Sequence, residues 1–542
     1  MSVNHTCWAT TMHSPLEVLQ TFPTHDFSLI GALHSRQSVK GNDPFIFTDQ
    51  QIISWNEFAV HVDHFARALA DRGITRSMRV AIMSRNNAAH VLSLFALAQL
   101  GAVMVPVNPD FGEREASYML THADVHGIIC DEGALPIAQG VFKTLTGCHW
   151  VMTVEPRANG SIDVWAEVTR GQSLAPVKPV GCAQDTCIII YTSGTTGFPK
   201  GVMHSQSNLI RAGEANVERL HLQPDDRYLI VLPFFHVNAV FYSLGGVLAS
   251  GSSMILTPRF SASSFWETAA KYRATVVNII EAIGTILCNR DRTEYRPDHC
   301  IRAAYGVRKT AEATFRSDFG IHKIMSGFGM TEIPGVTCNP WDGPSKPGSM
   351  GTVGRHPDPA LQWASCRVVD EEGSDVAIGQ TGEFWVKTPI VMQGYFRDPE
   401  QTAKAFEGGW FKTGDIVRQD ADGFFYHLSR KKDIIRRRGE NISAVELETV
   451  LLELPAVYQA AAIAVPSELG EDDIMVVIVK QPGQALEASE VVHWCQSKLS
   501  AIKVPRFVSF INTMPLTPTH KILKAALRND PAILANATDF QK

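Results

Sequence analysis

The sequence lacks an unbroken apolar run long enough to span a membrane. Its most apolar window, HVLSLFALAQLGAVMVPV from His90, is interrupted by Gln99, Gly101 and Pro106. The window therefore predicts a helix, a turn and a buried strand rather than a membrane span. Basic residues are also missing from the N-terminus, where the first Lys or Arg is Arg36, so we expect no signal peptide. Together these absences predict a cytoplasmic protein.

Paired cysteines and an excess of positive charge are missing as well. The ten cysteines form no CxxC pair, and no His cluster completes a metal-binding spacing. Reduced, mostly buried thiols are therefore the expectation. The formal net charge of -6 argues against a nucleic-acid partner, because such proteins usually present a basic face.

What the sequence does contain is an alternation of helical and strand patterns. A helix is predicted over 56–73, a strand over 79–84, a helix over 86–100 and a strand over 102–107. The same alternation returns as far as about residue 325. It predicts an α/β protein with parallel sheets, and 542 residues suffice for several cores.

The composition changes after about residue 345 and again after 430. The stretches GTVGRHPDPALQWASCRVVD and GEFWVKTPIVMQGYF predict short strands with Pro and Gly turns, as in a small β barrel or sandwich. The charge-dense stretch RKKDIIRRRGENIS (430–443) marks a boundary between compact units. A smaller α+β unit follows, with predicted helices over 444–453 and 487–500 and strands over 460–465, 473–480 and 506–511.

A glycine-rich stretch, YTSGTTGFPKGV (191–202), follows the buried-strand run CIII. Its Gly, Ser and Thr residues let backbone N–H groups and hydroxyls converge on an anion, and Lys200 adds a point charge. It does not satisfy the P-loop pattern GxxxxGK[ST]. Pro199 precedes Lys200, and proline has no N–H to donate. A generic turn is the alternative for so short a loop.

The stretch resembles the signature loop of the adenylate-forming enzymes, which include acyl-CoA synthetases, firefly luciferase and stand-alone adenylation domains. The resemblance covers about residues 40–530, and further motifs follow in the family's order. These motifs are LPFFHVNA (232–239), GFGMTE (327–332), TGE (381–383), GYF (394–396), GWFKTGD (409–415), RKKDIIRRRGENISAVELE (430–448) and PLTPTHKILKAALR (515–528). The segment SASSFWETAAKYRATVV (261–277) is similar to the carnitine/crotonobetaine CoA ligase branch.

The resemblance implies an organisation into domains. It predicts a large N-terminal adenylation domain over 1–429, a hinge over 430–432 with Lys432 as the hinge residue, and a small mobile C-terminal domain over 433–542. The family usually has glycine where this chain has Ser429 and His520.

It also implies two chemical steps. A carboxylate attacks the α-phosphorus of ATP, with Mg²⁺, to give an acyl-adenylate and pyrophosphate; the thiol of coenzyme A then displaces AMP. The alternatives are transfer to a carrier-protein thiol or an amine, a nucleotide-binding protein without turnover, and a P-loop kinase or ATPase that releases ADP. The partners are a small carboxylic acid and coenzyme A, and the sequence leaves the oligomeric state open, a homodimer included.

The resemblance assigns roles to nucleotide contacts. Phe328 would lie against adenine, with Gly329 beside it; Thr331 would contact phosphate and Glu332 would bind Mg²⁺. Asp415 would accept both ribose hydroxyls, with Arg430 as a second nucleotide contact. The β- and γ-phosphates would be held by Thr192, Ser193, Gly194, Thr195, Thr196, Gly197 and Lys200.

Ordinary structural roles are the alternatives at these positions. Thr331 and Glu332 could be a helix N-cap with a first-turn acid. Asp415 could be a β-turn residue, and Arg430 a surface charge.

Other residues would serve the acid and the second step. Lys521 would enter the adenylation site and contact carboxylate and phosphate oxygens, and Gly439 would line the thiol tunnel. His236 would gate or line the acid pocket, where Asp is typical of amino-acid-activating members; a satisfied core histidine is the alternative. The remaining pocket residues would be Asn238, Tyr242, Tyr305, Gly306 and Val307. Many members have a second glycine after the position of Gly306, whereas this chain has Val307 there. Because of this departure, the acid stays undetermined.

Overall fold

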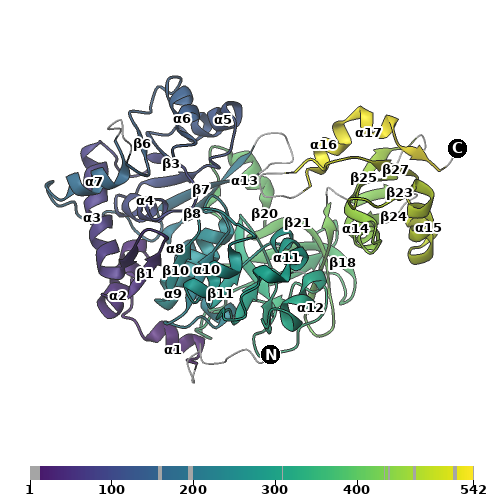
Figure 1. Cartoon of the computed structure of the whole chain (residues 1–542), viewed down its shortest axis with the longest axis horizontal. Helices are drawn as coiled ribbons and strands as arrows, with labels where there is room; N and C mark the ends of the chain where they lie inside the picture. The colour runs from purple at the N-terminus through teal and green to yellow at the C-terminus, as the bar shows by residue number, and fades with distance from the viewer. Residues whose placement is uncertain are drawn as a thin grey trace. The chain divides into compact units, whose positions relative to one another are not determined.

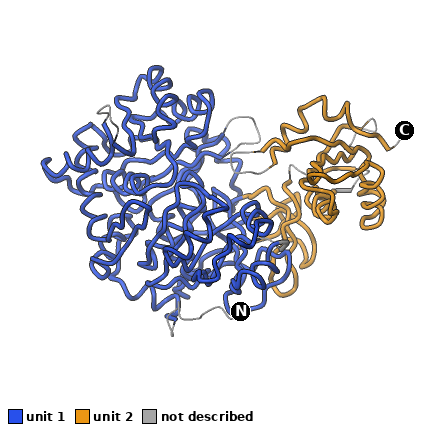
Figure 2. Tube along the Cα trace, viewed as in Figure 1, with its two compact units in different colours: residues 1–365, 386–411 blue, residues 366–385, 412–542 orange. Residues whose placement is uncertain are grey.

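The computed structural model describes residues 12–156, 162–192, 199–307, 309–431, 434–437, 440–467, 472–516 and 522–540. The chain divides into two compact units (Figure 2), unit 1 with residues 1–365 and 386–411 and unit 2 with residues 366–385 and 412–542. Each unit is described by itself. The domain boundaries expected from the sequence, 1–429, 430–432 and 433–542, stay a prediction.

Unit 1 contains two seven-stranded sheets, and Figure 1 labels several of their strands and helices. In the first sheet all neighbours are parallel except the edge strand β2, which is antiparallel to β1. Its order is β13 (Lys323–Met325), β12 (Ala303–Tyr305), β11 (Val276–Asn278), β9 (Arg227–Ile230), β10 (Ser253–Leu256), β1 (Pro44–Phe47) and β2 (Ile52–Ser54).

The second sheet is parallel on one side and antiparallel on the other. Strands β7 and β8 form an antiparallel hairpin, and β19 pairs antiparallel with β8. The order is β19 (Gly394–Tyr395), β8 (Lys200–Ser205), β7 (Thr186–Thr192), β4 (Val103–Pro106), β3 (Arg79–Met83), β5 (Gly127–Cys130) and β6 (Val151–Thr153).

Helices alternate with the strands along unit 1, as the sequence predicted. They are α1 (Pro15–Gln20), α2 (Leu29–Lys40), α3 (Trp55–Asp71), α4 (Ala88–Gln99), α5 (Glu113–Ala123), α6 (Leu135–Phe142), α7 (Val164–Gly171), α8 (Gln206–Leu220), α9 (Gly245–Ser250), α10 (Phe265–Lys271), α11 (Glu281–Asn289), α12 (Lys309–Ser317) and α13 (Pro399–Ala405).

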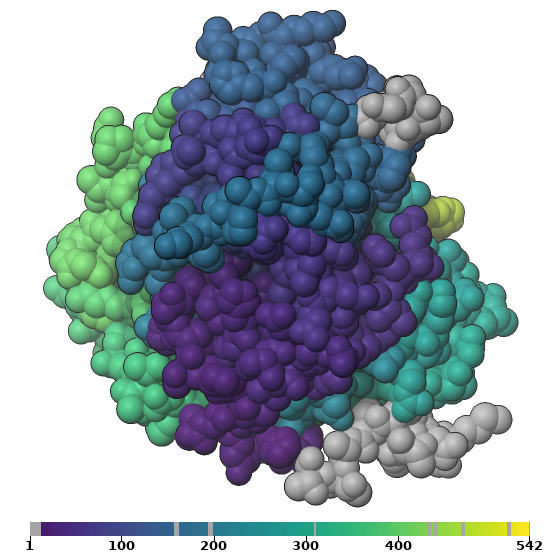
Figure 3. Space-filling model, turned by 90° about the vertical axis from the view of Figure 1, so that its left-hand side faces the viewer, coloured from purple at the N-terminus to yellow at the C-terminus, as the bar shows by residue number. Residues whose placement is uncertain are grey.

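Helix α3 illustrates how local sequence sets these elements. Ser54 and Glu57 form a capping box at its start, and apolar residues spaced by three or four positions are buried along one face. The helix packs against α7, where Arg72 Nε donates to Glu167 Oε2 at 2.7 Å. Figure 3 shows this side of unit 1, with the purple N-terminal segment and the blue segment side by side at the surface.

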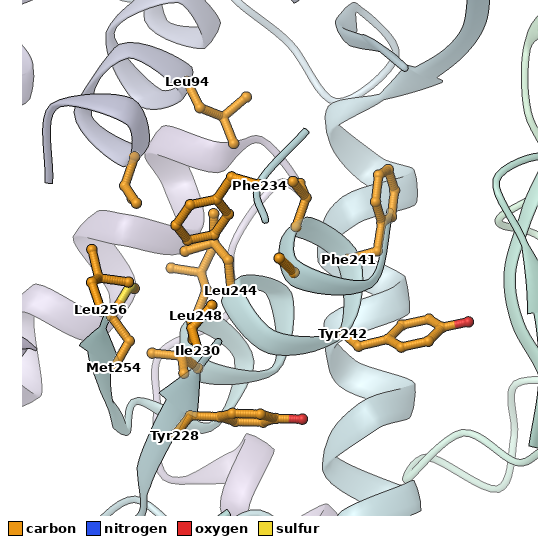
Figure 4. Packing of buried hydrophobic residues seen from close by; sticks show 14 of the residues in the cluster. Leu94, Tyr228, Ile230, Phe234, Phe241, Tyr242, Leu244, Leu248, Met254 and Leu256 are labelled. Carbon is orange, nitrogen blue, oxygen red and sulfur yellow. The ribbon is translucent and has the colours of Figure 1, made fainter. Parts of the chain in front are cut away.

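A π-helical segment, η2 (Asn238–Leu244), lies between β9 and α9. It packs into the main apolar core through Phe241 and Leu244, which are 0 % and 1 % exposed. Figure 4 shows Phe234, Leu244 and Leu248 in this core, with the hydroxyls of Tyr228 and Tyr242 pointing away from it to the same side. The sequence did not predict this segment as helical.

Antiparallel strands follow β13, in agreement with the predicted β-barrel-like part. Unit 1 holds β14 (Gly327–Met330), β15 (Ile333–Cys338) and β16 (Thr352–Val353), joined as a three-stranded sheet. A further sheet contains β17 (Ser365–Val369), β18 (Thr381–Lys387), β20 (Phe406–Glu407), β21 (Trp410–Gln419) and β22 (Phe425–Arg430).

The last part of unit 2 is the predicted α+β fold. Strand β25 is antiparallel to β26, and β26 is parallel to β27, so every helix and strand predicted after residue 443 is present within a few residues. The elements are β23 (Ile434–Arg437), β24 (Glu440–Ser443), α14 (Ala444–Leu452), β25 (Val457–Pro466), β26 (Asp472–Lys480), α15 (Ala488–Lys498), β27 (Phe507–Phe510), α16 (Lys524–Asn529), α17 (Pro531–Ala535) and β28 (Thr538–Asp539). The predicted α/β fold class is confirmed.

The sequence predicted no membrane span and reduced thiols. Across the described ranges, no helix is long and apolar enough to cross a membrane. Most described cysteines are free thiols, Cys130 and Cys187 among them. Cys300 is disulfide-bonded, so the expectation that all the thiols are reduced is wrong at that position.

Candidate active site

Several predicted site residues fall outside the described residues, and their assigned roles stay predictions. They are Ser193, Gly194, Thr195, Thr196, Gly197, Lys432, Gly439 and Lys521. The geometry below therefore concerns the flanks of the glycine-rich stretch and the other predicted residues.

The flanks of the glycine-rich stretch belong to two antiparallel strands. Thr192 ends β7 and pairs with Lys200, which begins β8. Helix α8 starts only at Gln206, after β8 is complete. A P-loop instead runs from its strand directly into a helix. The structure thus excludes a P-loop here, as the position of Pro199 predicted.

Lys200 is held over an aromatic ring. Its Nζ donates to Gln401 Oε1 at 2.8 Å and lies 4.9 Å from the centre of the Tyr395 ring. A cavity of about 180 Å³ opens beside these three residues. The sequence analysis quoted Tyr395 within a motif but assigned it no role.

The GFGMTE motif forms a β-hairpin. Strand β14 carries Phe328 and Gly329, strand β15 begins at Ile333, and Thr331 and Glu332 make the turn between them. The N-cap alternative for these two residues is therefore wrong, because no helix starts here.

Glu332 is 6 % exposed and contacts the same side chain as Lys200, that of Tyr395. The Tyr395 hydroxyl donates to Glu332 Oε1 at 2.8 Å, while the face of the same ring lies under the Lys200 ammonium. The Tyr395 side chain thereby holds both a cation and a carboxylate in place. This pairing suits a phosphate chain that carries a hard cation.

His204 fixes the backbone of the hairpin turn. The Nε2 atom lies 2.6 Å from the carbonyl oxygen of Thr331, and Asn208 Nδ2 lies 2.9 Å from the other ring nitrogen. Burial lowers the pKa of His204 to about 4, so the ring is neutral, with Nε2–H as the donor and Nδ1 as the acceptor. The sequence analysis missed this histidine; a polar residue on a buried strand just after the loop was the available signal.

The described residues contain no group of three or more His, Cys, Asp or Glu side chains arranged to hold a metal ion. Glu332 is the carboxylate predicted for Mg²⁺. A single carboxylate is compatible with Mg²⁺, since that ion takes most of its ligands from phosphates and water.

The predicted acid-binding residues come together around η2 and the end of β12. Tyr242 and Tyr305 meet edge to face with ring centres 5.7 Å apart. Asn238 Oδ1 accepts from Asn278 Nδ2 at 2.8 Å. His236 lies just before η2, where its N–H donates to the carbonyl of Pro233 at 3.0 Å.

Gly306 and Val307 close the end of β12. Gly306 has a φ of +87°, and a Cβ there would overlap the carbonyl oxygen of Ile279, so only glycine fits without strain. Val307 is 1 % exposed and belongs to the apolar core. This arrangement places four predicted pocket residues, Tyr242, Tyr305, Gly306 and Val307, beside the first sheet.

In unit 2, Asp415 is 1 % exposed, and its two carboxylate oxygens have different surroundings. Oδ1 lies 2.8 Å from His427 Nε2 and 2.8 Å from Arg430 Nε. Oδ2 is buried and has no hydrogen-bond partner among the described residues. A buried, unsatisfied carboxylate oxygen is costly, so it fits a ligand that brings hydroxyl donors.

Strand register creates this arrangement. Asp415 lies within β21 and pairs directly with Arg430 on β22, while His427 reaches it from the same strand. The turn alternative for Asp415 is wrong, because Asp415 lies within a strand, and Arg430 is a partly exposed charge that pairs with it. His427 was missed, because the sequence does not reveal the register of a hairpin.

The TGE motif supports the same strand. Glu383 accepts from the N–H of Gly414 at 3.3 Å through Oε1 and from Lys431 Nζ at 3.0 Å through Oε2. It therefore links the start of the basic stretch to the glycine that precedes Asp415.

These features define a nucleotide-using enzyme whose glycine-rich loop joins two antiparallel strands. Residues 33–396 match the family described as AMP-binding enzyme, and residues 446–521 match the AMP-binding enzyme C-terminal domain. The chain belongs to the AMP-binding enzyme family and is an adenylate-forming enzyme.

Curated and solved relatives are similar over most of this chain. Sulfoacetate–CoA ligase of Cupriavidus necator is 29 % identical over 93 % of this chain and 98 % of its own. Crotonobetaine/carnitine–CoA ligase of Salmonella paratyphi B is 27 % identical over 86 % and 91 %. The crystal structure of ATP-bound MatB from Rhodopseudomonas palustris is 27 % identical, covers 93 % of this chain and 98 % of that one, and superposes with a TM-score of 0.84.

Proposed function

We propose that this protein is an ATP-dependent acid–thiol ligase. It converts a carboxylic acid and ATP into an acyl-adenylate and pyrophosphate, then transfers the acyl group to coenzyme A with release of AMP. The observation that carries nucleotide use is Asp415, whose buried Oδ2 atom has no partner among the described residues. Coenzyme A as the acceptor is supported by the relatives named as CoA ligases.

The residues in unit 1 would serve the phosphates. Thr192, Lys200 and the loop residues 193–197 would hold the β- and γ-phosphates, which leave as pyrophosphate. Thr331 would contact phosphate, and Glu332 would be a ligand of Mg²⁺. Phe328 and Gly329 would lie against adenine.

The residues in unit 2 would serve the ribose and the second step. Asp415 would accept the ribose hydroxyls, while Arg430 and His427 keep its carboxylate oriented. Lys521 would stabilise charge during adenylation, Lys432 would be the hinge, and Gly439 would line the path of the thiol.

The acid would bind beside Tyr242, Tyr305 and Gly306, with His236 and Asn238 at the start of η2. Relatives act by name on sulfoacetate and on crotonobetaine or carnitine. Short acids that carry a second polar group are therefore the first to test.

The test is product analysis with a panel of short, medium, aromatic, sulfonated and betaine-type acids. We expect AMP and pyrophosphate from at least one acid, and an acyl-CoA only when coenzyme A is present. ADP and phosphate would contradict an adenylating enzyme. Acyl transfer to a carrier protein or an amine, with coenzyme A inert, would favour the alternative acceptor.

A further inference from the structure

A buried arginine lies against the predicted acid-binding residues. Arg219, on α8, is 5 % exposed. Its guanidinium carbon lies 4.9 Å from the centre of the Tyr242 ring and 5.5 Å from that of Tyr305. The guanidinium is charged at any physiological pH, so a full positive charge lies beside both tyrosines.

The described residues do not neutralise this charge. Arg219 Nη1 donates to Asn216 Oδ1 at a long 3.3 Å, and its Nε has no hydrogen-bond partner there. No described carboxylate lies within ion-pair distance of it. By contrast, the half-buried Arg302 has Asp226 at 2.5 Å.

The other groups around Arg219 are neutral. Burial raises the pKa of the Tyr242 and Tyr305 hydroxyls. It also raises the pKa of the nearby Cys338 thiol to about 11. None of these groups supplies a negative charge near pH 7. Because a buried, uncompensated charge is strongly destabilising, the arrangement calls for an anion from outside the chain.

Two glycines let this group approach the GFGMTE hairpin closely. A Cβ at Gly335 would overlap Arg219 Nη2, and a Cβ at Gly329 would overlap the Tyr242 hydroxyl. Arg219 and Tyr242 therefore lie against the backbone of the hairpin whose turn carries Thr331 and Glu332. The charge is thus close to the predicted site of adenylation, on the side of the acid.

Polar side chains extend from Arg219 toward the predicted acid pocket. Asn216 Nδ2 donates to the carbonyl of Tyr242 at 2.9 Å. The Tyr228 hydroxyl donates to Asn278 Oδ1 at 2.6 Å, and Asn278 in turn donates to Asn238. Figure 4 shows that the Tyr228 and Tyr242 hydroxyls point away from the aliphatic core. A long hydrocarbon tail would bring no hydrogen-bond partner to this polar surface or to the Arg219 guanidinium.

We propose that Arg219 binds a second anionic group of the acid substrate, a carboxylate or a sulfonate, at the end remote from the carboxylate that is activated. The inference rests on the proposed function and specifies its substrate class as short dianionic acids. The planar guanidinium suits two-point recognition of either group. An acid that ends in a methyl group instead leaves the buried charge unpaired, and sites of this kind reject such analogues strongly.

The test compares acids of matched length in the full-length protein. Succinate, malonate and sulfoacetate are paired with butyrate and propionate, and pyrophosphate release gives kcat/KM for each. We expect the wild type to favour one of the dianionic acids over its monoanionic partner by at least about 100-fold. A wild type that shows no such preference overturns the proposal, and this result does not depend on any variant.

Arg219→Met then removes the charge and keeps an apolar stem. We expect kcat/KM for the preferred dianionic acid to fall at least about 100-fold, with little change for the monoanionic acid and for ATP. Arg219→Lys should restore part of the preference. Equal losses for both kinds of acid would assign Arg219 a structural role and overturn the proposal. The matched control is Arg211→Met on the same helix, whose guanidinium lies over Phe27.

Direct calorimetric binding of the same acids separates this proposal from the proposed function. Binding of a dianionic acid that is lost in Arg219→Met but not in Arg211→Met supports the Arg219 site even if no acid yields AMP and pyrophosphate. Such a result would reject the proposed ligase reaction and leave the Arg219 site supported. Binding that is equal in the wild type and in Arg219→Met overturns the Arg219 site.

Discussion

At the residue scale, the most informative side chain is a carboxylate with one satisfied and one unsatisfied oxygen. His427 and Arg430 hold Oδ1 of Asp415, while the buried Oδ2 has no described partner. The two partners fix the orientation of the carboxylate. This arrangement leaves Oδ2 available to the ribose hydroxyls, as the proposed function requires.

Asp415→Ala should raise the KM for ATP by about 10- to 100-fold, because hydrogen bonds to a charged acceptor contribute about 1.5–3 kcal/mol each. Steady-state pyrophosphate release at varied ATP measures the change. Asp422→Ala, in the exposed turn of the same hairpin, is the control and should leave KM unchanged. An unaltered ATP dependence in Asp415→Ala would refute the ribose contact.

A second residue-scale prediction concerns His204 and pH. Burial lowers its folded-state pKa to about 4, below the usual value of about 6.5. Between these two pH values the unfolded state binds a proton that the folded state does not. Stability from this group is therefore complete above pH 6.5 and is lost as the pH falls toward 4.

Denaturant unfolding at several pH values compares the wild type with His204→Gln. The wild type should lose up to about 1.4 kcal/mol more per pH unit between pH 6 and 4.5 than the variant. Exposed carboxylates titrate in both proteins, so the difference in slope isolates His204. Identical slopes would show that the folded protein protonates this ring.

At the element scale, turns and strand ends place the site. The glycine-rich stretch joins β7 to β8, the GFGMTE turn joins β14 to β15, and Gly306 ends β12. In each case a strand fixes the backbone on at least one side of the functional segment. Such anchoring fixes the ends of segments that lie outside regular structure.

Gly306→Ala tests the element that ends β12. The positive φ and the nearby Ile279 carbonyl should make this change cost about 1–3 kcal/mol of stability and weaken binding of the acid. Gly284→Ala, within α11, is the matched control, since its Cβ would meet only ordinary contacts and helix propensity favours alanine. Denaturant midpoints measure both. Equal stability of the two variants would contradict the strain at Gly306.

At the scale of the whole molecule, the proposed reaction uses both compact units. Lys200 and Glu332 belong to unit 1, and Asp415, Arg430 and Lys521 belong to unit 2. The proposed hinge at Lys432 would let one chain serve two half-reactions in turn. The two steps are therefore expected to respond differently to changes in unit 2.

Lys521→Ala should reduce acyl-adenylate formation by at least about 100-fold, because a preorganised positive charge is lost from the transition state. Thioester formation from supplied acyl-adenylate and coenzyme A should be nearly unchanged. Single-turnover assays of each half-reaction measure this split. The control is Lys524→Ala, whose Nζ pairs with Glu448 within unit 2. Equal losses in both half-reactions would refute the role of Lys521.

The sequence by itself determined the α/β elements, the antiparallel part and the family's motifs, because these depend on local patterns of burial, turns and short-range spacing. Pro199 also sufficed to exclude a P-loop. Only the tertiary structure decided which side chains meet. Register brought His427 to Asp415, the β19–β8 pairing placed Tyr395 beside Lys200, and the packing of α8 on η2 set Arg219 against Tyr242. Contacts between residues far apart in sequence follow from the whole fold, so no local pattern revealed them.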